Sequence, residues 1–130
     1  MLVNGVDIIE IQRISNVAVR YGTRFLERIY TDQEKSYCQG RAPQLASRFA
    51  AKEAVMKALG TGTHGVRWKD IEVVRTSGRA PTIELHGTAL NRADQLGITH
   101  IAVSLSHSKE FAVAVVVAES ASSNQNTISK

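Results

Sequence analysis

The stretch Phe49-Ala-Ala-Lys52-Glu53-Ala-Val-Met-Lys57-Ala-Leu-Gly60 carries most of the information about the fold. It continues a helical pattern that starts at Pro43, a residue acceptable in a first turn, and it stops at Gly60. At about 100° per residue, the pattern places bulky side chains on one face and alanines on another. These two faces are formed by Leu45, Phe49 and Met56, and by Ala46, Ala50, Ala54 and Ala58. The sequence therefore predicts a long packed helix with a small-residue ridge suited to close packing.

Three charged residues interrupt these apolar faces. Glu53 and Lys57 fall between them, and Lys52 falls within the bulky face. A helix that only supported a core would collect its charges on one solvent face. In the ordinary interpretation, Glu53 and Lys57 form an i,i+4 ion pair worth a few tenths of a kcal/mol, and the Lys52 ammonium extends to solvent. In the alternative, the three groups form part of a chemical site.

The segments on either side alternate between helical and strand patterns without a dividing linker. Thr31 and Glu34 have the spacing of a capping box for a helix that reaches Cys38. We expect strands over 2–9, 71–75, 82–86, 101–106 and 111–118, and further helices over 10–20, 24–30 and 87–96. These patterns predict one α+β domain over residues 1–118 with an antiparallel sheet, followed by a disordered polar tail over 119–130.

Composition excludes several classes of protein. The 130 residues contain one cysteine, Cys38, so neither an intramolecular disulfide scaffold nor a zinc ribbon is possible. No apolar run approaches the roughly 20 residues of a membrane span, and no secretory signal opens the chain, so we expect a cytoplasmic protein without a membrane partner. The net charge is +4, and residues 11–60 carry nine Lys and Arg against four acids. This distribution favours an anionic partner.

Asp7 lies in an otherwise apolar strand, where a buried carboxylate is costly unless a charge or metal compensates it. The ordinary interpretation is an Asp that begins a turn at a strand end. If Asp7 and Glu53 converge, they offer two hard oxygen ligands of the kind that hold Mg²⁺ beside a substrate phosphate. Lys52 and Lys57 would then supply the cations that phosphoryl transfer needs.

Two other groups of residues could bind phosphate. Ser106 and His107 lie at an expected hairpin tip and offer hydrogen-bond donors, although a histidine in a turn is more often solvated. Gly60, Gly62 and Gly65 could bring backbone N–H groups near an anion, but this is not a P-loop because no Gly-Lys-Ser/Thr follows.

A row of arginines continues the basic character of the first half. Arg13, Arg20, Arg24 and Arg28 are spaced by 7, 4 and 4 residues and lie near one line if the helix bends little at Gly22. Such a row is usually a solvated face. With Phe25 as an apolar anchor, it could instead dock an acidic helix. Nucleic acid fits the charge, but the chain has no basic-aromatic stacking motif, so we expect no nucleic-acid partner.

Three segments, in order, resemble one family. They are Gly5-Val-Asp7-Ile-Ile-Glu-Ile-Gln-Arg13-Ile, the 49–60 stretch quoted above, and Ser104-Leu-Ser-His107. Together they resemble the holo-acyl-carrier-protein synthases, the short-chain 4′-phosphopantetheinyl transferases, over about residues 2–118. The resemblance implies a homotrimer with active sites at the subunit interfaces. It also implies transfer of 4′-phosphopantetheine from coenzyme A to a serine hydroxyl of an apo acyl carrier protein, with release of adenosine 3′,5′-bisphosphate.

The resemblance also implies roles for individual residues. Asp7 and Glu53 would hold Mg²⁺, with Lys57 near the reacting phosphate. Coenzyme A would be bound by Lys52, Gly60, Ser106 and His107, and the acidic carrier helix by Arg13, Arg20, Arg24 and Phe25. Double-length relatives often have an acid where Ile9 stands, so waters would fill more of the metal shell. Our candidate for the general base is Glu53 or a metal-bound water that it orients. The competing hypothesis is a small basic module that binds nucleic acid or an acidic protein.

Overall fold

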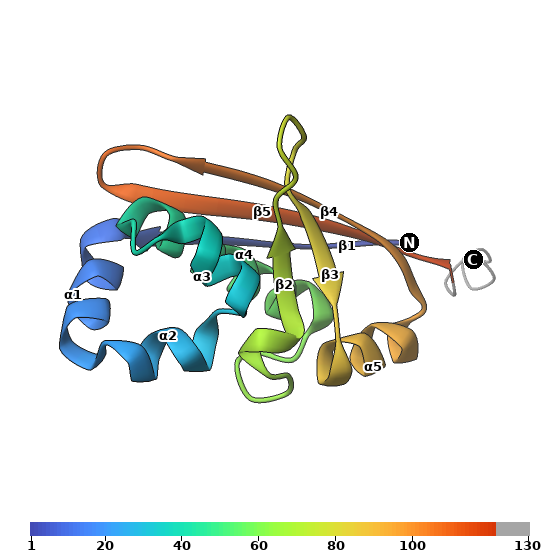
Figure 1. Ribbon diagram of the computed structural model, residues 1–130. Helices are drawn as coiled ribbons and strands as arrows, with labels where there is room; N and C mark the ends of the chain where they lie inside the picture. Colours follow the sequence, from blue (N-terminus) through green and yellow to red (C-terminus); the bar gives the residue numbers. More distant parts are fainter. Residues whose placement is uncertain (122–130) are drawn as a thin grey trace.

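The computed structural model describes residues 1–121 and confirms the predicted α+β class (Figure 1). Every predicted helix and strand is present, with bounds that differ by at most three residues. In chain order the elements are β1 (Leu2–Glu10), α1 (Ile11–Tyr21), α2 (Thr23–Ile29), α3 (Asp32–Cys38), α4 (Ala42–Leu59), the 3₁₀ turn η1 (Trp68–Asp70), β2 (Ile71–Val74), β3 (Thr82–Leu85), α5 (Gly87–Leu96), β4 (Ile98–His107) and β5 (Phe111–Ser120).

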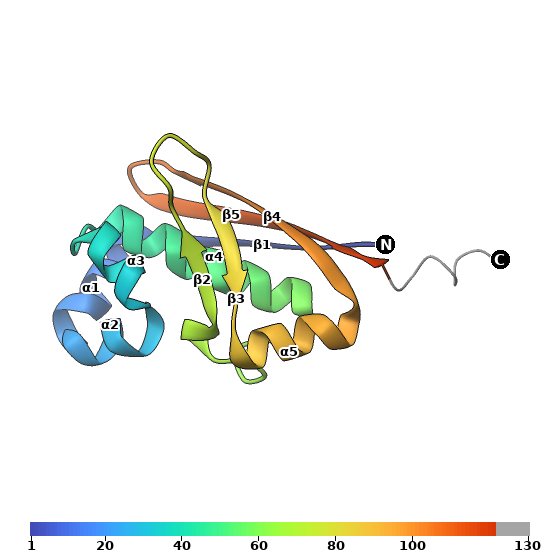
Figure 2. The ribbon, with the colours of Figure 1, turned by 45° about the vertical axis from the view of Figure 1, so that its right-hand side comes forward.

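The main sheet is antiparallel, with strand order β1-β5-β4. Helix α4 packs along one of its faces, and the short β2–β3 ribbon crosses in front of them (Figures 1 and 2). Alternate β5 residues are fully buried among the residues of this core, because side chains alternate between the two faces of a strand. They are Ala112, Ala114, Val116 and Ala118. Small residues thus line the sheet where α4 packs.

The alanine ridge of α4 lies directly against strand β1. A Cβ added to Gly5 would lie 2.0 Å from the carbonyl oxygen of Ala54, so only glycine fits at this position. Ala46, Ala50 and Ala54 have no exposed surface. The predicted close packing of the alanine ridge is therefore confirmed, and the element that packs against the ridge is strand β1 of the same chain.

The capping box that the sequence predicts is also present. The Thr31 hydroxyl accepts from the Glu34 backbone N–H, and the Glu34 carboxylate accepts from the Thr31 N–H. This motif fixes the start of α3 where the chain turns back toward α4.

The course of the chain at Gly22 decides how the four arginines are arranged. Gly22 has a φ of 55° and separates α1 from α2, which run in different directions, so the condition for one straight row of arginines is not met (Figure 1). Strand β5 extends to Ser120, so residues 119 and 120 belong to the sheet and not to the predicted tail; residues 122–130 of that tail lie outside the described residues. Among the described helices, none combines the length and apolar character needed to cross a membrane.

Candidate functional site

Asp7 on β1 and Glu53 on α4 come together, as the sequence analysis predicted, and Lys57 joins them. The Lys57 Nζ donates to Asp7 Oδ1 at 3.2 Å and to the Val6 carbonyl at 2.8 Å. The Asp7 side chain is only 14% exposed, whereas that of Lys57 is 55% exposed. The second Asp7 oxygen, Oδ2, is buried and has no hydrogen-bond partner among residues 1–121. An unpartnered buried carboxylate oxygen is costly, and a bound cation would satisfy it.

The neighbouring carboxyl of Glu53 is held partly protonated near neutral pH. Burial, together with the interaction with the adjacent Asp7 carboxylate, raises the pKa of Glu53 from 4.5 to about 7, while Lys57 and Arg13 act in the opposite direction. Two carboxyl groups at close range cannot both ionise without a compensating positive charge. The pair therefore has the electrostatic character of a cation site.

The pair opens into a pocket of about 540 Å³ between β1, α1 and α4. Most of its wall is apolar, and Arg13 is the only cation among the described residues that line it. Phe25 and Val17 line both this pocket and a shallower groove that also contains Arg24 and Arg28. The two carboxylates are therefore continuous with the arginine-bearing surface of α1 and α2, where Arg13, Arg20 and Arg24 are exposed.

The raised pKa of Glu53 predicts how stability depends on pH. Between pH 4.5 and about 7 the folded protein keeps a proton on Glu53 that the unfolded chain releases, so without metal this group makes the free energy of unfolding fall as pH rises. Mg²⁺ should offset that loss at pH 8, because it favours the ionised pair. Thermal denaturation between pH 5 and 8, with EDTA and with Mg²⁺, measures both effects.

Glu53→Gln is the matched control for this prediction, because it removes the titrating proton and keeps the side-chain volume. The variant should lose this component of the pH dependence and most of the stabilisation by Mg²⁺. An identical pH profile in the wild-type protein and in Glu53→Gln would show that Glu53 is not the responsible group.

Lys52 does not lie where the sequence analysis expected it. Its side chain has no exposed surface, and its Nζ lies 2.8 Å from Glu34 Oε1, 3.1 Å from the Trp68 carbonyl and 2.5 Å from the Ile71 carbonyl. Burial lowers the pKa of Lys52, and the Glu34 carboxylate counteracts that shift. All three ammonium protons thus have acceptors inside the chain. The expectation that Lys52 contacts coenzyme A is therefore wrong for this arrangement.

Ser106 and His107 lie in a different place from the carboxylate pair. They line a pocket of about 160 Å³ together with Arg48 and Arg75. Arg48 is only 5% exposed, and its guanidinium lies 4.5 Å from the centre of the Tyr37 ring. Arg48 was not among the predicted site residues, although its position on the central helix, outside the alanine ridge, was a usable signal. This pocket has two guanidinium groups and an imidazole, and none of its lining residues is an acid.

The two pockets lie on different sides of α4. Glu53 and Arg48 are five residues apart, which is about 140° around the helix axis. Asp7 and Leu105 both pair with Ala114 of β5, so the strands that carry the carboxylate and the His107 turn are the two edges of the sheet. Within one chain, the structure brings Asp7, Glu53 and Lys57 together and leaves Ser106 and His107 apart from them.

Gly60 ends α4 in the left-handed conformation, with a φ of 72°. Its backbone N–H donates to the Lys57 carbonyl at 3.1 Å. The structure therefore gives the Gly60 N–H a helix-capping role, and the coenzyme A contact that the resemblance implied for Gly60 stays a prediction.

Comparison with known proteins identifies the class of protein. A family model described as the 4′-phosphopantetheinyl transferase superfamily matches residues 4–116. A holo-[acyl-carrier-protein] synthase of Herpetosiphon aurantiacus is 48% identical over 124 residues, covering 90% of this chain and 98% of that protein. One from Dehalococcoides mccartyi is 50% identical over 119 residues, covering 92% and 99%. The chain belongs to the 4′-phosphopantetheinyl transferase superfamily.

Solved structures narrow the similarity to one branch of that superfamily. The holo-[acyl-carrier-protein] synthase of Helicobacter pylori, in complex with coenzyme A, has a TM-score of 0.82 and 34% identity, and the match covers 89% of this chain and 99% of that one. The synthase of Bacillus anthracis, in complex with CoA (3′,5′-ADP), has a TM-score of 0.74 and 38% identity, with coverage of 92% and 96%. These relatives are all holo-[acyl-carrier-protein] synthases, which favours the transferase over the basic binding module.

Proposed function

We propose that the chain transfers 4′-phosphopantetheine from coenzyme A to a serine hydroxyl of an apo acyl carrier protein and releases adenosine 3′,5′-bisphosphate. The observation that carries this proposal is the convergence of Asp7, Glu53 and Lys57 beside a pocket. The printed names of the relatives and the coenzyme A in two of their structures support the choice of substrates.

Mg²⁺ fits the residues at this pocket. Asp7 and Glu53 are oxygen donors, and the buried, unpartnered Oδ2 of Asp7 is a coordinating atom that the protein itself leaves unsatisfied. We propose that these two carboxylates hold the ion, with waters filling the positions that Ile9 does not provide. When bound, Mg²⁺ supplies positive charge that stabilises the diphosphate of coenzyme A during transfer.

The side chains around the pocket supply the remaining chemistry. In the proposed reaction the serine oxygen attacks phosphorus, the bond to the leaving adenosine bisphosphate breaks, and the hydroxyl proton goes to a base. The candidate base is Glu53, whose carboxylate lines the pocket beside Asp7, or a metal-bound water that Glu53 orients. The exposed ammonium of Lys57 can reach the charge that develops on the transferred phosphate.

Direct detection of the product tests the proposal. The protein is incubated with coenzyme A, Mg²⁺ and an apo acyl carrier protein, and mass spectrometry then detects the phosphopantetheine adduct on the carrier. We expect complete modification with Mg²⁺ and almost none with EDTA. Absence of the adduct with several carrier proteins would reject the function.

We further propose that a second copy of the chain completes each site, in the homotrimer that the resemblance implied. On the face of the main sheet opposite α4, the described residues leave an apolar patch of β1 and β5 uncovered: Val6 and Ile8 of β1 are 54% and 62% exposed, and Val115 of β5 is 43% exposed. Val6 and Val115 are direct register partners, so they form a continuous patch. A second copy covering this patch could bring its Arg48 and His107 pocket toward the carboxylates.

Subunit complementation tests the shared site. Asp7→Asn and His107→Ala chains should each transfer slowly alone. After co-expression, some interfaces combine one intact Asp7 with one intact His107, so activity should return to about a quarter of the wild-type value if mixing is random. A monomer in light scattering, or mixtures as inactive as the parents, would contradict the proposal.

The arginine-bearing surface of α1 and α2 supports docking of the acidic carrier helix. Changing Arg13, Arg20 or Arg24 to Glu should raise the KM for the carrier protein several-fold and weaken its salt dependence, because exposed charges act through electrostatic steering. The KM for coenzyme A should hardly change. Steady-state kinetics with each substrate titrated at two salt concentrations measures the effect.

Two further variants sharpen this comparison. Arg79→Glu changes an exposed arginine in the turn between β2 and β3 and should leave both KM values unchanged. Phe25→Leu should weaken carrier binding in a salt-independent way, as loss of an apolar anchor would. If the reversals at α1 and α2 impaired coenzyme A binding equally, the arginines would belong to the nucleotide pocket.

A further inference from the structure

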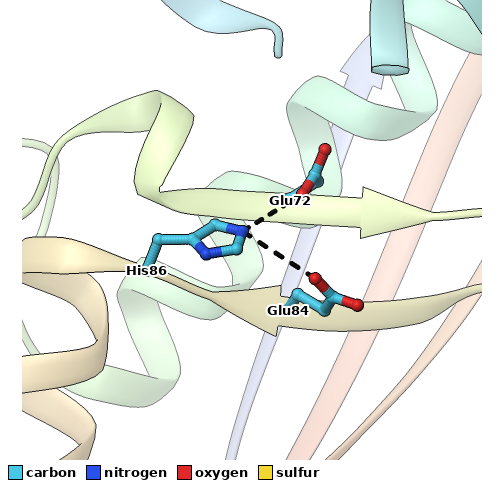
Figure 3. A group of neighbouring side chains, drawn as sticks. All are labelled: Glu72, Glu84 and His86. Carbon is cyan, nitrogen blue, oxygen red and sulfur yellow. Dashed lines mark hydrogen bonds and ion pairs between the residues drawn. The ribbon is translucent and has the colours of Figure 1, made fainter. Parts of the chain in front are cut away.

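We propose that Glu72, Glu84 and His86 form a second metal site, on the β2–β3 ribbon, that takes a divalent transition metal such as Zn²⁺. One ligand atom from each residue lies within 4.8 Å of the other two. The His86 Nε2 is 3.1 Å from Glu72 Oε1 and 3.9 Å from Glu84 Oε1. Figure 3 shows the imidazole pointing toward both carboxylates, with Glu72 on one strand and Glu84 on the other.

The register of the ribbon places the two carboxylates together. Glu72 and Glu84 are direct partners in the antiparallel pairing of β2 and β3. Like charges directly opposite each other destabilise such a pair, and Glu72 is only 8% exposed, so solvent screens it poorly. The Lys52 ammonium attracts Glu72 but is held by Glu34 at 2.8 Å. A bound cation would therefore relieve a repulsion that the strand pairing creates.

Neighbouring groups hold two of the three ligands in position. The Thr31 hydroxyl donates to Glu72 Oε2 at 2.7 Å, which leaves Oε1 directed at His86. Thr31 is itself fixed as the N-cap of α3. The His86 backbone N–H donates to the Asp70 carbonyl at 2.8 Å. Hydrogen bonds of this kind to ligating carboxylates are typical of metal sites, where they orient the ligand.

The donor set distinguishes this site from the pocket at Asp7. One imidazole nitrogen with two carboxylate oxygens suits Zn²⁺ and related transition metals, whereas Mg²⁺ prefers oxygen ligands alone. Donors about 2.1 Å from Zn²⁺ in a tetrahedral site lie about 3.4 Å apart. The 58% exposed side chain of Glu84 therefore needs to move inward only slightly. A metal bound here would link the N-cap residues of two helices: His86 of α5 as a ligand, and Thr31 of α3 through its hydrogen bond to Glu72.

Titration calorimetry with Zn²⁺ on the full chain tests the site, with millimolar Mg²⁺ present to occupy the all-oxygen pocket. We expect one Zn²⁺ per chain, and His86→Ala and Glu84→Gln should each weaken binding at least tenfold. The matched control is His100→Ala, because His100 Nδ1 lies 3.8 Å from a single carboxylate, that of Glu119. This control should bind Zn²⁺ like the wild-type protein.

Stability and activity measurements separate this inference from the proposed function. Zn²⁺ should raise the Tm of the wild-type protein by several degrees and leave that of His86→Ala unchanged. His86→Ala should retain Mg²⁺-dependent transfer, since His86 lies outside the carboxylate pocket. Absence of Zn²⁺ binding, or equal binding by His86→Ala and the wild-type protein, would overturn the proposed metal site whatever the outcome of the transferase assay.

Discussion

Asp7→Asn and Glu53→Gln are each expected to lower the transfer rate by at least about 10³-fold while leaving the chain folded. Both changes remove a negative charge from the proposed Mg²⁺ ligands and keep the side-chain volume. Glu53→Gln also removes the repulsion between two partly buried carboxyl groups, so its Tm without metal at pH 8 should equal or exceed that of the wild-type protein. Rate measurements across a range of Mg²⁺ concentrations, with circular dichroism on each variant, make the comparison.

Binding measurements make this first prediction more specific. Coenzyme A should increase the affinity for Mg²⁺, because the ion is expected to contact both the carboxylates and the substrate phosphates. The control is Glu119→Gln, which removes an exposed acid from the far end of β5 and should leave transfer unchanged. Near-normal transfer by both Asp7→Asn and Glu53→Gln would rule out the metal site. If calorimetry showed that coenzyme A leaves the affinity for Mg²⁺ unchanged, contact between the ion and the substrate would be ruled out.

Lys52→Met is expected to destabilise the protein by about 3–5 kcal/mol, because it leaves the Glu34 carboxylate buried without its cation. Small domains have a free energy of unfolding of about 5–15 kcal/mol, so a substantial fraction of the Lys52→Met molecules should be unfolded at 37 °C. Chemical denaturation measures this effect. Its matched control is Lys57→Met, on the same helix: Lys57 is 55% exposed, so its pairing with Asp7 contributes at most about 1 kcal/mol.

The double variant Glu34→Gln/Lys52→Met distinguishes a buried ion pair from simple loss of packing. Removing both charges should recover part of the stability lost in Lys52→Met, since no unpaired charge remains. Stability losses that simply add in the double variant would show that the two residues act independently. A loss of coenzyme A binding at unchanged stability would restore the substrate-binding role first expected for Lys52.

The charged residues of α4 show how far the sequence could predict the site. Glu53 and Lys57 were singled out because their positions on α4 broke an apolar pattern that local periodicity reveals. The partner of Lys52 could not be found in this way, because Glu34 lies in a different helix and meets Lys52 only through the tertiary fold. The same applies to Glu72 and Glu84, whose proximity depends on the register of the ribbon. Periodicity predicted the elements and the buried faces, and tertiary contacts determined which charges meet.

The contact between Gly5 and Ala54 has a consequence for protein engineering. Any side chain at position 5 would push α4 away from β1, and with it Glu53 away from Asp7, because these residues lie next to the contact on the same two elements. In a library of random variants selected for growth, position 5 should accept as little variation as the carboxylates, although glycine has no functional group. Efforts to stabilise the scaffold should therefore leave its glycines in place: even at Gly40 and Gly78, where an added Cβ meets no atom within 4 Å, the φ values of 74° and 77° would strain any other residue.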